Sequence, residues 1–183
     1  MKYLLPIILI IIFPVKIFAA ENLQNLYAST FFSPEIIQIE NVFKSIVKGS
    51  DGSVVYTRVP RGLIVSVAQS QLFDNGKTEI KKCGLLVLNA VIQVMKTFNN
   101  KCVIESHTDE TLPADSPYKE DWEVTIIRAN KIADYLVKIG KIPPERIFPL
   151  GFGEYMPFNE NVSKTGFTDS RIDFVIIDYE LNR

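Results

Sequence analysis

The order of hydrophobic patterns along this chain restricts its fold, because helix-like and strand-like segments alternate. Apolar residues recur at intervals of three and four in residues 79–98 and 122–139, as expected of helices that lie on a sheet. The segments 53–59 and 63–68 are β-branched and alternating, which predicts a hairpin. Residues 171–177 place apolar side chains on both faces of a strand, which is typical of a central position.

Shorter apolar segments predict two more strands, at 103–106 and 147–150. Strands that alternate with two main helices imply a fold of the α/β class, an α+β sandwich. The helix predicted at 79–98 is assigned to the hydrophobic core.

Because the two cysteines lie near opposite ends of this helix, roughly 20 Å apart, we expect no disulfide between Cys83 and Cys102.

Composition argues against several classes of function. The net charge is −1, so there is no basic excess that would indicate nucleic-acid binding. No Ser, Cys or Lys has a recognisable local base, and we expect neither enzymatic activity nor a cofactor. His107 is the only histidine and the two cysteines are far apart, so we expect no metal site; as a metal ligand, His107 would need partners from elsewhere in the chain.

The chain is expected to have three parts. Residues 1–20 have the features of a bacterial secretory signal peptide: a positive start, an aliphatic run and small residues before Glu21. The run is shorter than the roughly 20 residues of a membrane-spanning helix, so no stable transmembrane span is favoured, although an uncleaved inner-membrane anchor is an alternative. Residues 21–52 form an extension with an amphipathic helix after Pro34, and residues 53–183 form the main domain. The helix either packs on this domain or docks onto a larger envelope assembly.

One acidic and one basic residue stand where they could bind the same ligand. Thr108 and Asp109 follow the strand at 103–106, and a strand end is a common place for a binding side chain. Arg128 falls on the polar side of the helix at 122–139, where a guanidinium can grip a carboxylate through two hydrogen bonds. Together they would suit a small ligand with an ammonium and a carboxylate group. They could equally form a surface ion pair worth about 0 to 1 kcal/mol.

Five motifs follow one another along the chain: His107-Thr108-Asp109, Asp121-Trp122-Glu123-Val124-Thr125, Arg128-Ala129, Tyr135-Leu136, and Gly151-Phe152-Gly153-Glu154 with Pro157 and Asn161. In order and spacing they resemble the OmpA-like C-terminal domain, closest to the MotB/OmpA subtype. The resemblance covers roughly residues 61–178. It implies an OmpA-like fold with an about four-stranded mixed sheet and two main helices packed on one face.

Proteins of that family bind the peptide stem of peptidoglycan without cleaving it. The resemblance therefore implies that Asp109 takes the ammonium group of diaminopimelate and that Arg128 takes its carboxylate. It places five further residues in or beside the pocket: Thr108, Asp121, Arg171, Phe73 and Asp74. For Phe73 and Asp74, a turn anchored by a buried Phe is an equal alternative. The expected location is the periplasm, at the cell wall, with association to the outer or inner membrane.

The chain departs from the family pattern at places that matter for binding. Ser106 stands where the family usually has Gly, Asp121 where it has Asn, and Asp169-Ser170 where it has Asn-Arg. Asp121 would repel a carboxylate ligand, although the same charge suits an N-cap of the following helix. The function that we expect is still that of a non-catalytic module that anchors its own chain, or an attached complex, to peptidoglycan. The departures motivate an alternative, an interaction subunit of an envelope machine, such as a secretion system, that has lost wall binding.

Overall fold

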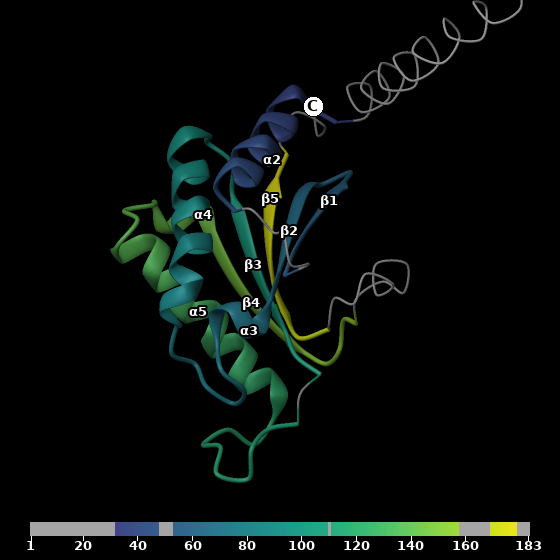
Figure 1. Cartoon of the computed structure of the whole chain (residues 1–183), viewed down its shortest axis with the longest axis vertical. Helices are drawn as coiled ribbons and strands as arrows, with labels where there is room; N and C mark the ends of the chain where they lie inside the picture. The colour runs from purple at the N-terminus through teal and green to yellow at the C-terminus, as the bar shows by residue number, and fades with distance from the viewer. Residues whose placement is uncertain (1–31, 48–52, 110, 158–168, 179–183) are drawn as a thin grey trace, which may run out of the picture.

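The computed structural model describes residues 32–47, 53–109, 111–157 and 169–178, and these contain one five-stranded sheet in the order β1-β2-β5-β3-β4 (Figure 1). The strands are β1 Val54–Val59, β2 Gly62–Ala68, β3 Cys102–His107, β4 Ile147–Gly153 and β5 Arg171–Ile177. The expected α/β class is confirmed. The sheet has five strands rather than about four, since both strands of the predicted hairpin join it.

The last strand lies at the centre of the sheet, as its apolar pattern predicted. β5 pairs antiparallel with β2 on one side and with β3 on the other, whereas β3 and β4 are parallel. The hairpin of β1 and β2 turns at Gly62, which has a φ of 137°. A Cβ atom at this position would lie 2.0 Å from the Ile176 carbonyl oxygen, so only glycine fits.

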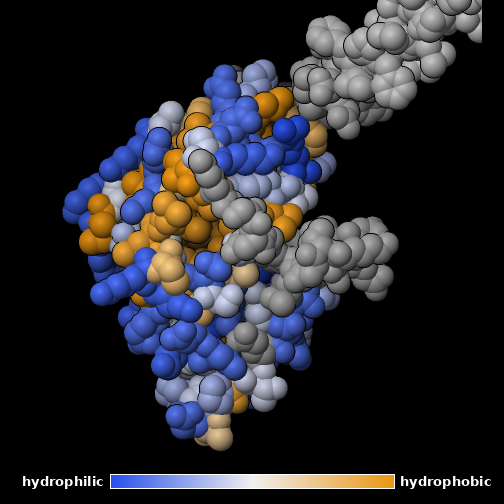
Figure 2. Space-filling view, in the orientation of Figure 1, coloured by the Kyte–Doolittle hydropathy of each residue, from blue (hydrophilic) through white to orange (hydrophobic). Residues whose placement is uncertain are grey.

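Three longer helices cover one face of the sheet, one more than expected (Figure 1). The helices are α2 Pro34–Ile46, the short α3 Gln69–Leu72, α4 Leu85–Thr97 and α5 Asp121–Lys138, with 3-10 turns η1 Lys82–Gly84 and η2 Pro144–Arg146. α5 packs mainly on β4 and β3, and α2 packs on α4. Figure 2 shows hydrophobic residues gathered on the upper part of this face, where α2 and α4 lie, and hydrophilic residues at the lower end.

The N-terminal helix is part of the hydrophobic core. The amphipathic helix expected after Pro34 is confirmed, and its Ile36, Ile39 and Phe43 are fully buried. Of the two alternatives for this helix, packing on the domain is therefore what the structure shows. The division into 1–20, 21–52 and 53–183 stays a prediction, and the signal segment lies outside the described residues. None of the helices in the described ranges is long and apolar enough to cross a membrane.

A buried carboxylate ties α2 to the sheet. Glu40 accepts hydrogen bonds from Lys44, one turn along the same helix, and from Arg58 on β1. Burial alone would raise the pKa of Glu40, but the two cations outweigh it and lower the pKa below its ordinary value. This ion pair therefore stabilises the position of α2 when Glu40 is ionised.

Both cysteines are free, as expected. Cys83 is exposed in η1, whereas Cys102 is buried in β3. α4 begins at Leu85, six residues later than the hydrophobic stripe suggested, because the chain before it runs beside α3. There the Lys81 N–H donates to the Leu72 carbonyl oxygen at 2.8 Å.

Candidate functional site

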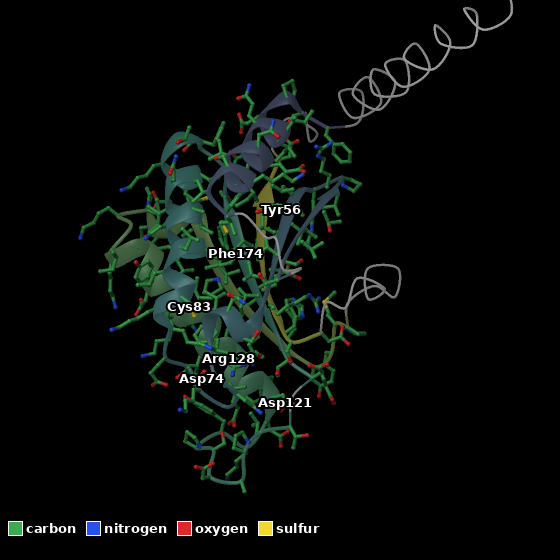
Figure 3. All side chains as sticks on the ribbon, in the orientation of Figure 1. Tyr56, Asp74, Cys83, Asp121, Arg128 and Phe174 are labelled. Atoms are coloured by element: carbon green, nitrogen blue, oxygen red, sulfur yellow. The ribbon has the colours of Figure 1, made fainter. Side chains whose placement is uncertain are left out.

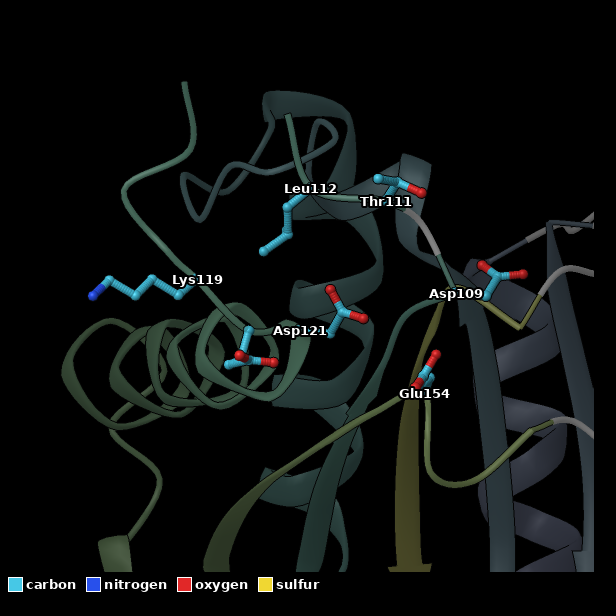
Figure 4. A pocket seen from close by; sticks show the side chains of 7 residues that line it. Asp109, Thr111, Leu112, Lys119, Asp121 and Glu154 are labelled. Atoms are coloured by element: carbon cyan, nitrogen blue, oxygen red, sulfur yellow. The ribbon is translucent and has the colours of Figure 1, made fainter. Parts of the chain in front are cut away.

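An open hollow of about 380 Å³ lies where β3 ends and α5 begins. Its walls come from Asp109, Thr111, Leu112, Lys119, Glu120, Asp121 and Glu154. Figure 4 shows the carboxylates of Asp109, Asp121 and Glu154 around it, with the Lys119 side chain directed away from them. Four carboxylates therefore share this wall with one ammonium group, so the hollow suits a ligand that brings positive charge.

Asp109 is held in place by a serine that is 61 residues away in sequence. The Ser170 hydroxyl donates to the Asp109 carboxylate, and the same oxygen accepts from the Asp109 N–H at 3.1 Å. It also lies 3.2 Å from the Thr108 hydroxyl. A hydroxyl has one donor and two acceptor sites, and these three contacts occupy all of them on Ser170. In the sequence, Ser170 stands out only as a departure from the family pattern.

Thr108 supports the site from behind and does not line the hollow. It is buried, and its N–H donates to the carbonyl oxygen of Gly153 at the end of β4 at 3.0 Å. This bond joins the ends of two parallel strands. Asp109 therefore projects from a rigid strand end, as expected from the sequence.

Asp121 lines the hollow, but it is not the N-cap of α5. Asp121 is the first helical residue, and Glu120 occupies the cap position. The Glu123 carboxylate accepts hydrogen bonds from the backbone N–H groups of Lys119 and Glu120 at 2.7 and 3.1 Å. These two bonds lower the pKa of Glu123. Since Glu120 and Glu123 form the capping box at the helix start, the Asp121 carboxylate does not serve as the cap and remains available to the hollow.

Arg128 is buried, so the expectation that it lies on the polar side of the helix is wrong. Only 1% of its surface is exposed, and it is not among the residues that line the hollow. Its Nε donates to the Lys77 carbonyl oxygen at 2.8 Å and its Nη2 to the Asp74 carbonyl oxygen at 3.0 Å. Its Nη1 donates to the Gln69 side-chain oxygen. α3 supplies the Gln69 acceptor and the segment after α3 supplies the two carbonyl oxygens, and Figure 3 shows Arg128 beside Asp74.

Of the two alternatives for Phe73 and Asp74, the structure shows the anchored turn. Phe73 is buried, and the Arg128 guanidinium carbon lies 5.4 Å from the centre of its ring. The Asp74 carboxylate is exposed and pairs with Lys81 at 3.2 Å. Neither residue belongs to the wall of the hollow.

Arg171 lies on the sheet face that points away from the helices. Its side chain is buried and donates to Asp173 at 2.9 Å and to the carbonyl oxygens of Asp169 and Met156 at 3.1 and 3.2 Å. The residues expected to form one pocket therefore lie in three places: at the hollow, under the segment that follows α3, and on the sheet face away from the helices. Asp109 and Asp121 reach the hollow, whereas Lys119, Glu120 and Glu154 are wall residues that sequence analysis missed.

Residues 72–171, more than half of the chain, match the sequence model of the OmpA family, and the chain belongs to this family. The resemblance seen in the sequence is thereby confirmed. Membership of this family agrees with the expectation that the chain is not an enzyme.

Individual proteins of the same kind show similarity over most of this chain. It is 26% identical to Motility protein B of Bacillus subtilis (strain 168) over 125 residues, 63% of this chain and 45% of that protein. The chain spans about half the length of the curated relatives it matches.

Two solved structures share the fold. One is a putative MotB-like protein from Desulfovibrio vulgaris, with a TM-score of 0.66 and 22% identity over 78% of this chain and 93% of that chain. The other is the cell wall anchor of the T6SS from Pseudomonas aeruginosa, with a TM-score of 0.64 and 17% identity over 76% of this chain and 97% of that chain.

Proposed function

We propose that this chain is a non-catalytic peptidoglycan-binding module of the bacterial envelope. It holds the diaminopimelate of the stem peptide between Asp109 and Arg128 and so anchors itself, or an attached complex, to the cell wall. The location that follows is the periplasm. The T6SS protein that shares this fold is, by its description, a cell wall anchor, and this similarity supports the proposal.

The position of Asp109 is the observation that carries the proposal. Its carboxylate projects from the end of β3 into the acidic hollow, and Ser170 holds it in one orientation. A ligand ammonium group placed here would lie among the carboxylates of Asp109, Asp121 and Glu154. Because Ser170 holds the Asp109 carboxylate before the ligand arrives, less ordering of this group opposes binding.

Arg128 requires an exchange of partners before it can bind a ligand carboxylate. Two of its acceptors are the carbonyl oxygens of Asp74 and Lys77, residues on an exposed segment that water can reach. We infer that the ligand carboxylate replaces one of these oxygens as the acceptor. A carboxylate accepts guanidinium hydrogen bonds more strongly than a neutral carbonyl does, which favours the exchange.

Co-sedimentation with insoluble peptidoglycan of the diaminopimelate type tests the proposal. We expect Asp109→Asn, which removes the charge and keeps the shape, to lower binding at least tenfold. Asp115→Asn is the matched control, because Asp115 is an exposed acid of the neighbouring loop outside the hollow. Wild-type protein that stays in the supernatant, or equal binding by Asp109→Asn and wild type, would refute the proposal.

The role of Arg128 is tested separately with peptidoglycan that has lysine in place of diaminopimelate. Lysine keeps the ammonium group and lacks the second carboxylate. Wild-type protein should therefore bind the diaminopimelate wall more tightly than the lysine wall, and Arg128→Lys should reduce that preference. Equal binding of both walls by wild type would leave Arg128 as a structural residue only.

A second candidate function is supported by apolar side chains on the surface. Trp122, Leu150, Tyr155 and Met156 are large and exposed, with Tyr155 77% exposed. Such side chains are typical of protein contacts, as in an interaction subunit of an envelope machine. Deleting residues 21–52 is a poor test, because it would remove the core residues of α2. The double variant Tyr155→Ser, Met156→Ser is a sharper test. Loss of co-purifying partners with unchanged wall binding in this variant would favour the second function.

A further inference from the structure

A second polar cluster lies on the sheet face opposite the helices. β3 and β5 are paired in register, so Glu105 lies opposite Asp173 and His107 lies opposite Arg171. Glu105, His107 and Asp173 are only 7%, 2% and 4% exposed. Each offers a ligand atom, and these atoms all lie within 4.8 Å of one another. The hollow at Asp109 uses none of the three.

Within the described ranges, several polar atoms of this cluster lack a hydrogen-bond partner. Both ring nitrogens of His107 and Oδ1 of Asp173 are buried and unsatisfied. The His107 Nε2 lies 3.5 Å from Asp173 Oδ2, which is too far for a good hydrogen bond. Buried polar atoms without partners are rare, so several in one place make this cluster a candidate ligand site.

The histidine ring is oriented so that its edge stays available. It stacks on Phe152, with ring centres 5.0 Å apart and planes only 4° from parallel. The stack covers a ring face and leaves the in-plane nitrogens free to meet a ligand. A neutral imidazole keeps a lone pair on one ring nitrogen, through which it can bind a metal ion.

The two carboxylates differ in how firmly they are held. Asp173 accepts from Arg171 Nε at 2.9 Å through Oδ2, which leaves Oδ1 available. Among the described residues, the Glu105 side chain accepts hydrogen bonds from Arg61 alone, at 3.3 and 3.5 Å, and about half of the Arg61 side chain is exposed. Arg61 can therefore turn out into water and give way to a different cation.

We propose that Glu105, His107 and Asp173 bind a divalent transition-metal ion of the Zn²⁺ type. One imidazole nitrogen and two carboxylate oxygens form a donor set that suits this ion. Tetrahedral zinc with bonds of about 2.0 to 2.2 Å places its ligand atoms roughly 3.4 Å apart, so small side-chain movements close the site. The ion replaces Arg61 at Glu105 and links β3 to β5 behind the strand end that carries Asp109.

Zinc titration of the full chain, stripped with a chelator and monitored by competition with a chromophoric zinc indicator, tests the proposal. We expect one Zn²⁺ per chain and a rise in melting temperature on binding. His107→Phe keeps the stack on Phe152 and removes both nitrogens, and it should weaken binding at least 100-fold and abolish the rise in melting temperature. Asp173→Asn, nearly identical in shape, should weaken binding at least 30-fold.

Two further variants separate this site from unspecific zinc binding. Cys83 is an exposed thiol, so Cys83→Ser must leave both affinity and stoichiometry unchanged. Arg61→Met should raise affinity about threefold to tenfold, because the ion no longer competes with the guanidinium. Near-ultraviolet circular dichroism verifies the fold of each variant. No binding by wild type, unchanged affinity in folded His107→Phe or Asp173→Asn, or loss of binding in Cys83→Ser would overturn the proposal.

Discussion

Replacing Arg128 with methionine keeps most of the buried stem and removes the guanidinium group. Three acceptors then lose their donor: the side-chain oxygen of Gln69 and the carbonyl oxygens of Asp74 and Lys77. Gln69 is buried, and an unsatisfied buried group costs about 1 to 3 kcal/mol. The other two residues are exposed, so water can replace the donor at a cost of about 0.5 to 1.5 kcal/mol each.

An opposing contribution comes from the charge itself, because burying a guanidinium is unfavourable and methionine avoids that cost. We therefore expect Arg128→Met to lower the free energy of unfolding by about 2 to 4 kcal/mol. Urea denaturation followed by tryptophan fluorescence measures this change. Limited proteolysis should also cut the segment 73–81 sooner, since the guanidinium no longer ties it to α5.

The matched control is Lys131→Met, which removes an exposed cation from the same helix. This change should alter the free energy of unfolding by less than about 0.5 kcal/mol. If Arg128→Met were no less stable than Lys131→Met, the three hydrogen bonds would contribute nothing net. The assignment of Arg128 as an anchor for this segment would then be refuted.

Four further changes test other parts of the structure. Because ionised Glu40 is stabilised, its contribution is present above pH 4.5 and is lost as the pH falls through the lowered pKa of Glu40 in the folded protein; the melting temperatures of wild type and Glu40→Gln should differ at pH 7, and the difference should shrink as the pH falls below 4.5. Phe43→Ala should cost about 3 to 5 kcal/mol in urea unfolding, whereas an unchanged midpoint would place α2 outside the folding unit. Gly62→Ala should cost more than about 2 kcal/mol, because its Cβ meets a backbone oxygen; equal stability would contradict the turn geometry. Ser170→Ala should weaken wall binding about threefold to tenfold by releasing the Asp109 carboxylate, and full binding would show that Ser170 does not position it.

Periodicity along the sequence was enough to predict most of the elements. The spacing of apolar residues in α5 and the alternation in the β1–β2 hairpin arise from contacts between near neighbours, so they can be read from one segment at a time. The two-faced apolar pattern of β5 correctly predicted a central strand. The hydrophobic stripe before α4 was misleading at its start, because residues 79–84 are not part of the α-helix, and the last three of them form the 3-10 turn η1.

Only the tertiary structure decided which polar side chains meet. In an isolated α5 helix, Arg128 would face water. It is buried in the protein because a segment more than 50 residues earlier in the sequence covers it. Ser170 reaches Asp109 across 61 residues, and His107 meets Asp173 through the pairing of β3 with β5. Local patterns report the periods of single helices and strands, whereas strand register and loop packing depend on contacts between distant residues. For this reason the sequence by itself determined the elements and the family resemblance, and the tertiary structure decided the composition of both polar sites.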